Sequence, residues 1–189
     1  QSPKVTFAEA AVRGQAPDKG LYFPEHIPQL PKDFIKNIRS YSKEELGFIV
    51  MKPYVGESIP DDVLHQIVAE TINFDFPLVK VTEDIYSLEL FHGPTLAFKD
   101  VGARFMSRCL GYFNRHAYHN TTVLVATSGD TGGAVANGFL GVDGVEVIIL
   151  YPSGKVSPIQ ELQLTTCRQN ITALEVQGNF DDCQAIVKH

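Results

Sequence analysis

The chain has 189 residues, of which 44% are hydrophobic and 20% are charged, with a formal net charge of −6 at pH 7. This composition is typical of a globular protein and excludes a disordered or fibrous one. The 16 Lys and Arg residues are scattered among 22 Asp and Glu residues, so no nucleic-acid partner is expected. The apolar runs are far shorter than the ~20 residues of a membrane-spanning helix, so no membrane partner is expected either.

The ends of the chain and its cysteines bear on processing and compartment. The chain starts at Gln1 without an initiator Met or a following apolar segment, so we expect no signal peptide and a true N-terminus further upstream. Cys109, Cys167 and Cys183 are far apart and form no C-x-x-C pair. They are typical of reduced thiols in a cytoplasmic protein and not of a disulfide framework or a zinc site.

Residues 1–78 are expected to form an N-terminal region, loop-rich at first and helical afterwards. Up to about Pro31, a turn at residues 17–20 and the prolines at 24, 28 and 31 argue against any long helix. From about residue 33 to 76 the pattern is helical. Ser42 and Glu45 have capping-box spacing, and residues 61–73 have apolar side chains at helical intervals.

Residues 79–189 predict an α/β domain. A strand is expected at 85–90, followed by a helix that runs to about Arg115. Three strand–turn–helix units follow, with strands at 122–126, 145–150 and 171–176. Strands that alternate with helices and lack clean polar alternation predict an open, mostly parallel twisted sheet with helices on both faces. The chain stops at His189, shortly after the last helix begins, so we expect this domain to be incomplete at its C-terminal end.

Residues 127–133, with the sequence TSGDTGG, lie between a predicted strand and a predicted helix. A helix N-terminus offers free N–H groups and partial positive charge, glycines allow close approach, and Ser128 and Thr131 add hydroxyl donors. This pattern predicts a site for a carboxylate or a phosphate, although it is neither a Walker loop nor a G-x-G-x-x-G fingerprint. The alternative is a tight turn in which Asp130 or Thr131 caps the helix.

Lys99 lies where a loop meets a helix, among the apolar residues Leu96, Ala97, Phe98 and Val101. Apolar surroundings reduce the hydration of an ammonium group and favour the neutral amine that forms Schiff bases. The alternative is a surface lysine paired with Asp100 or extended from the helix end into solvent.

The other candidates are weaker. His116 and His119 have the spacing of a metal pair, but no further ligand completes a set. His92, before Gly93, either orients a substrate or fixes the turn. Adjacent Asp181 and Asp182 fit helix capping better than acid–base catalysis, because neighbours on a helix point in different directions.

Two motifs together carry a family resemblance. Residues 90–100 (LFHGPTLAFKD) and residues 126–132 (ATSGDTG) closely resemble threonine synthases of the bacterial and fungal branch. Residues 16–24 and 178–184 extend the resemblance over almost the whole chain. It implies an N-terminal portion of a pyridoxal-phosphate enzyme of the type II fold.

The resemblance also implies an activity and site roles. The enzyme would convert O-phospho-L-homoserine and water to L-threonine and phosphate. Lys99 would bind pyridoxal phosphate as a Schiff base and then move protons between substrate carbons. Phe98 and Asp130 would lie near the cofactor. The substrate would be bound by Thr95, Ser128, Gly129 and Thr131, and no metal is implied.

Two departures qualify what the resemblance implies. Many type II enzymes carry Asn at the position of Asp130, whereas the threonine synthase branch that this chain resembles carries Asp. An ionised carboxylate, unlike the Asn amide, cannot donate a hydrogen bond to the cofactor's phenolic oxygen. We therefore expect Asp130 to tune the Schiff base. The family's glycine-rich loop for the cofactor phosphate lies beyond the equivalent of His189, so the 189 residues alone are expected to bind the cofactor poorly and to be inactive. The alternatives are another pyridoxal-phosphate lyase or dehydratase, or a non-catalytic anion-binding module.

Overall fold

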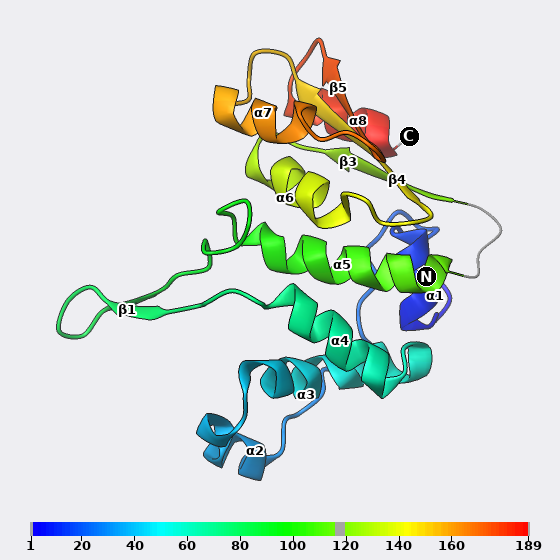
Figure 1. Ribbon diagram of the computed structural model, residues 1–189. Coiled ribbons are helices and arrows are strands. Elements are labelled where there is room, and N and C mark those ends of the chain that lie inside the picture. The colour runs from blue at the N-terminus through cyan, green and yellow to red at the C-terminus, as the bar shows by residue number, and fades with distance from the viewer. Residues whose placement is uncertain (1, 116–119, 189) are drawn as a thin grey trace. The chain divides into compact units, whose positions relative to one another are not determined.

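The computed structural model describes residues 2–115 and 120–188 (Figure 1). The chain divides into two compact units, Gln1–Asn73 and Phe74–His189, and each is described by itself.

The first unit is helical. Its longer helices are α3 (Lys43–Val55) and α4 (Asp61–Thr71), which pack against each other around the buried residues Leu64, Ile67 and Val68. The shorter segments are α2 (Lys32–Lys36) and the 3₁₀ turns η1 (Ile38–Ser40) and η2 (Gly56–Ser58). The predicted capping box of α3 is confirmed: Glu45 N donates to Ser42 Oγ at 3.2 Å, and Ser42 N donates to Glu45 Oε2 at 2.7 Å.

One helix of this unit was not expected from the sequence. α1 (Phe7–Arg13) is seven residues long and lies in the segment predicted to be loop-rich. It begins with a second capping box, in which Glu9 N donates to Thr6 Oγ1 and Thr6 N donates to Glu9 Oε2. The prediction of no long helix before Pro31 is nevertheless correct, because residues 14–31 contain no helix.

The second unit contains the predicted parallel sheet. Its strands are β3 (Thr121–Ala126), β4 (Val145–Pro152) and β5 (Ile171–Val176), in the order β3-β4-β5. Val123 pairs with Val147, and Val147 pairs with Ile171. The helices are α5 (Lys99–Asn114), α6 (Asp130–Phe139), α7 (Pro158–Thr165) and α8 (Phe180–Lys188). The α/β class is confirmed.

The strand predicted at 85–90 is shorter than expected and lies outside the parallel sheet. It is β2 (Tyr86–Leu88), which pairs antiparallel with β1 (Leu78–Lys80) in a two-stranded hairpin. All six paired residues are exposed in the described structure. The hairpin extends away from the helices of its own unit (Figure 1).

The connections between parallel strands place the helices. α6 joins β3 to β4, and α7 joins β4 to β5. Both connections step the same way along the strand order β3-β4-β5. Because such crossovers are right-handed, both helices lie on the same face of the sheet (Figure 1). α8 instead packs back across β3 and β4. The core under α6 and α7 is fully buried and includes Phe139, Ile149 and Leu164. All three parallel strands therefore present their carboxyl ends at one edge, where ligands of open α/β sheets bind.

Candidate active site

The loop after β3 is organised by Thr127, which the sequence analysis did not single out. Thr127 is 1% exposed, and its Oγ1 accepts hydrogen bonds from Gly129 N at 3.1 Å and Gly132 N at 2.9 Å. Two of the N–H groups at the start of α6 are thus satisfied by one side chain. The N-cap position, Gly129, makes no side-chain cap bond. The alternative in which Asp130 or Thr131 caps the helix is therefore wrong.

The glycines of this loop allow close packing of α7. A methyl group on Gly129 would lie 2.9 Å from both side-chain amide atoms of Gln160, and one on Gly132 would lie 2.8 Å from Leu164 Cδ2. Both distances are too short for a real contact. The glycines that suggested close approach of an anion thus also bring the start of α7 against the loop after β3.

Lys99 is the first residue of α5, as expected for the junction of a loop and a helix. Its Nζ donates to Asp130 Oδ2 at 2.8 Å and lies 4.0 Å from the centre of the Phe98 ring. The side chains of Lys99 and Asp130 are 30% and 47% exposed, so the ion pair is reachable from solvent. Lys99 does not pair with Asp100, which contradicts that alternative.

Asp100 faces the interior instead. Its Oδ2 accepts from Thr95 N at 3.0 Å, and its Oδ1 accepts from Thr95 Oγ1 at 2.5 Å. Thr95 has one hydroxyl proton and donates it to Asp100. In this geometry the Thr95 hydroxyl proton is engaged by Asp100 and is not available to a ligand.

The apolar neighbours of Lys99 are less enclosing than the sequence suggested. Ala97 is buried, but Leu96 and Phe98 are 73% and 59% exposed. Leu96 has a φ of +58°, a conformation that costs energy for a residue with a side chain. Lys99 is thus presented at a surface, beside one aromatic ring and one carboxylate.

The structure brings Lys99 into contact with both Phe98 and Asp130, and Thr95 bonds Asp100, the residue that follows Lys99 in the chain. Ser128 is exposed and lies two residues before α6, whereas Thr131 is half-buried and follows Asp130 in the first turn of α6. Thr127, Asp100 and Gln160 were missed as site residues. Thr127 and Asp100 lie within the two motifs, but only their burial distinguishes them from ordinary polar neighbours.

The structure gives contacts for two of the weaker candidates. His92 Nε2 lies 2.7 Å from Glu89 Oε2 in an exposed turn. Asp182 Oδ2 accepts from Asn179 N, and Asn179 Oδ1 accepts from Asp181 N, which confirms the expected capping of α8. His116 and His119 lie outside the described residues, and residues 2–115 and 120–188 contain no cluster of three His, Cys, Asp or Glu side chains suited to a metal.

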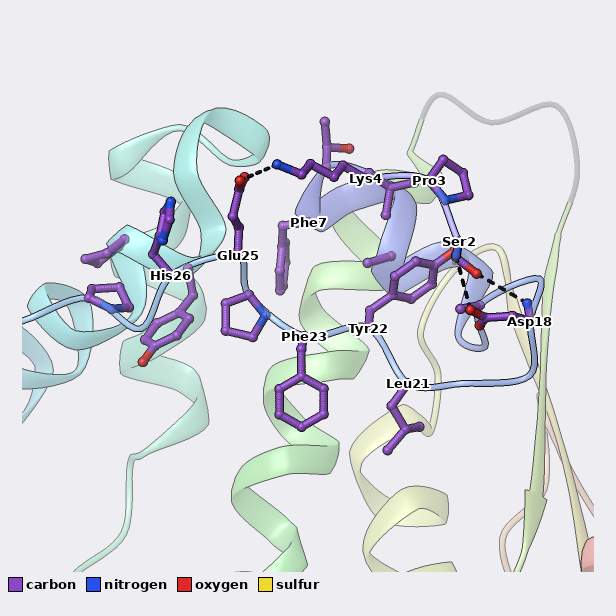
Figure 2. A pocket seen from close by; sticks show the side chains of 18 residues that line it. Ser2, Pro3, Lys4, Phe7, Asp18, Leu21, Tyr22, Phe23, Glu25 and His26 are labelled. Atoms are coloured by element: carbon purple, nitrogen blue, oxygen red, sulfur yellow. Dashed lines mark hydrogen bonds and ion pairs between the residues drawn. The ribbon is translucent and has the colours of Figure 1, made fainter.

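A separate cavity of about 770 Å³ lies within the first unit (Figure 2). It is lined by side chains from the segment between residues 2 and 28 and by Pro53 and Tyr54. Its walls carry an ion pair between Lys4 and Glu25 and hydrogen bonds between Ser2 and Asp18. None of the expected site residues lines it.

Comparison of the chain with known proteins finds relatives by sequence and by structure. The family model described as "Threonine synthase N terminus" matches residues 1–72. Threonine synthase of Haemophilus influenzae is 44% identical over 185 residues, which cover 98% of this chain and 43% of that protein.

Solved structures give the same result. The crystal structure of threonine synthase from Brucella melitensis with bound pyridoxal phosphate has a TM-score of 0.89 and 40% identity, over 100% of this chain and 42% of that one. The yeast threonine synthase structure has a TM-score of 0.87 and 42% identity, over 100% and 41%.

The chain therefore shares the fold of the matching part of these threonine synthase structures. The chain aligns over 98–100% of its length with threonine synthases of bacteria and yeast, and it spans about two fifths of the length of these relatives. No helix in the described ranges has the length and apolar character that crossing a membrane requires.

Proposed function

We propose that this chain supplies the lysine and the substrate-anion loop of a threonine synthase, which converts O-phospho-L-homoserine and water to L-threonine and phosphate. The observation that carries the proposal is the pair of Lys99 and Asp130, with Nζ and Oδ2 2.8 Å apart and accessible to solvent. The relatives that cover the chain at 40–44% identity carry the same activity in their names.

Pyridoxal phosphate is the cofactor that this site suits. The donor set is a primary amine that can bind an aldehyde, with a ring on one side and a carboxylate on the other. When bound, pyridoxal phosphate supplies an electron sink for carbanions next to the amino group. Lys99 would hold the cofactor covalently, and Phe98 and Asp130 would border it.

Asp130 has two roles in this proposal. Its carboxylate holds the Lys99 ammonium at one position, which orients the amine toward its reaction partner. It is also the nearest described acceptor for a proton that Lys99 must release before its amine can attack an aldehyde.

The beginning of α6 would bind the substrate carboxylate. Ser128 and Thr131 offer hydroxyl donors, and Gly129, whose N–H is bonded to Thr127, lies at the helix N-terminus, where negative charge is favoured. Thr127 holds this loop in shape. In this proposal the substrate is a small molecule.

The proposed location is the cytoplasm. Cys109, Cys167 and Cys183 support it, because they are free thiols and free thiols are typical of a reducing compartment.

An assay of phosphate and threonine tests the activity. The full-length protein with pyridoxal phosphate is supplied with O-phospho-L-homoserine, and phosphate and threonine are measured together. The proposal expects equal amounts of both, and it expects Lys99→Ala to abolish the reaction while Lys155→Ala, at an exposed lysine after β4, leaves it intact.

The two rivals give different products. Release of ammonia and a keto acid would indicate a dehydratase of the same fold. Reversible anion binding without turnover or any covalent adduct would indicate a binding module, and either result would contradict the proposed activity.

A further inference from the structure

Asp100 is a buried carboxylate that the proposed reaction does not use directly. Its residue is 1% exposed, and a buried carboxylate is unfavourable unless hydrogen bonds compensate for the lost hydration. Here both carboxylate oxygens accept from Thr95, one from the backbone N–H and one from the hydroxyl. The hydrogen bonding of Asp100 is thus directed at one residue of the loop that precedes α5.

That loop has a conformation that needs support. A methyl group on Gly93 would lie 2.5 Å from Asp100 Oδ2, so the loop backbone lies directly against the carboxylate. Leu96, within the same loop, has a φ of +58°. Such a conformation persists only where the surrounding contacts hold it. Asp100 supplies two of these contacts through Thr95.

Lys99 follows the loop directly and precedes Asp100 in the same first turn of α5. We propose that Asp100 is a positioning residue, which holds the loop through Thr95 and thereby fixes where Lys99 Nζ meets Asp130. This inference rests on the proposed function, in which Lys99 binds the cofactor. The positioning acts through hydrogen bonds, and the negative charge is not required for it.

Two substitutions at Asp100 separate hydrogen bonding from charge. In Asp100→Asn the side-chain carbonyl can accept from Thr95 N–H, and its amide can donate to Thr95 Oγ1 once that hydroxyl rotates. Both contacts are kept and the charge is lost. Asp100→Ala removes both contacts. Asn114→Ala is the matched control, because Asn114 lies at the opposite end of α5 and bonds Gly144 O and Thr121 Oγ1.

The experiment measures how fast Lys99 captures pyridoxal phosphate in the full-length protein. The absorbance of the bound cofactor follows the reaction, and borohydride reduction with peptide mapping locates the adduct. Turnover constants and the melting temperature of the cofactor-free protein are measured for each variant. These readouts distinguish positioning from a general loss of stability.

We expect Asp100→Ala to lower the capture rate and kcat by about 10- to 100-fold with KM nearly unchanged, because small misplacements of a reacting group have effects of this size. Asp100→Asn should restore most of both. Asn114→Ala should lower the melting temperature and leave capture by Lys99 unchanged.

Capture by Asp100→Ala at the wild-type rate would overturn the inference, and so would equal impairment of Asp100→Asn and Asp100→Ala. A wild-type protein that forms no adduct at Lys99 would contradict the proposed function itself, which is a different result from either of these.

Discussion

Thr127 shows how one side chain can set the geometry of a binding loop. Its hydroxyl accepts from Gly129 N and Gly132 N and donates to Gly129 O, all within a buried site. Buried donors that lose their acceptor cost more than the average hydrogen bond contributes. The loop between β3 and α6 should therefore depend on this hydroxyl and much less on the rest of the side chain.

Thr127→Val removes the hydroxyl and keeps the shape, so it leaves the buried Gly129 N–H without its acceptor and Gly132 N–H with Gly129 O alone, at 3.2 Å. We expect it to lower the free energy of unfolding by about 1–3 kcal/mol, measured by urea denaturation. Thr127→Ser keeps the hydroxyl and is the matched control. Equal losses in the two variants would show that packing, and not hydrogen bonding, holds the loop.

Cys109 adds a pH dependence to the stability. Burial raises the pKa of the Cys109 thiol from 9.0 to about 12. As the pH rises, the unfolded chain loses this proton first, so the folded state binds more protons and unfolding becomes easier. The contribution of Cys109 is complete below about pH 9 and is lost between pH 9 and about 12.

The test compares the wild type with Cys109→Ala in urea denaturation from pH 8 upward. The wild type should lose stability more steeply, by up to about 1.4 kcal/mol per pH unit, because one pKa unit corresponds to that energy. Burial also raises the pKa of the Cys167 and Cys183 thiols, and these groups act equally in both proteins. Parallel curves would contradict the assignment to Cys109.

At the scale of elements, the contact between α6 and α7 depends on glycines. A methyl group on Gly132 would meet Thr127 Cγ2 at 2.5 Å and Leu164 Cδ2 at 2.8 Å, both in the buried core. The helices would have to separate to accept it. Gly102, at an exposed position in the first half of α5, has no atom within 4 Å of the same position.

Gly132→Ala should therefore destabilise the protein by about 1–3 kcal/mol through overpacking. Gly102→Ala should stabilise it by up to about 1 kcal/mol, because alanine favours a helix over glycine. Thermal unfolding of both variants checks the pair. A stabilising Gly132→Ala would mean that α6 and α7 are not in close contact.

At the scale of the whole molecule, apolar side chains are left in solvent around the β1–β2 hairpin. Leu78, Val81, Ile85 and Leu88 are each more than half exposed. Strand edges with apolar side chains are sites of association between chains. The 189-residue chain by itself should therefore associate as its concentration rises.

Ile85→Lys should reduce this association, because a charged side chain on a strand edge opposes pairing. Sedimentation of the two proteins over a range of concentrations measures it. Ile159→Lys is the control, since Ile159 in α7 is also exposed, at 72% against 59% for Ile85, and lies outside the hairpin. A monomeric wild type, or an equal effect of both substitutions, would contradict the role of the hairpin.

Much of the fold was predictable because its signals are local. The helix cap at Ser42 and the strands after residues 120, 144 and 170 follow from spacing and apolar runs, and the structure confirms them. α1 was missed although Thr6 and Glu9 form a capping box, because the prolines around it dominated the pattern. The hairpin was misjudged because three-residue strands carry too little periodicity.

The site was less predictable, because its contacts join segments distant in sequence. The approach of Lys99 to Asp130 spans 31 positions, and no local pattern encodes it. Burial, which the sequence does not show, also separates the polar residues near the site: Asp100 and Thr127 are buried, while Ser128 is exposed. The resemblance in two motifs pointed to Lys99 and Asp130, but it did not indicate which neighbours hold them in place.

The most direct test of the central claim is peptide mapping after borohydride reduction of the full-length protein with pyridoxal phosphate. The account predicts a pyridoxyl group on Lys99 and on no other lysine, lost in Lys99→Arg and retained in Lys155→Ala. An adduct elsewhere, or none at all, would contradict the assignment of Lys99 as the residue that binds the cofactor.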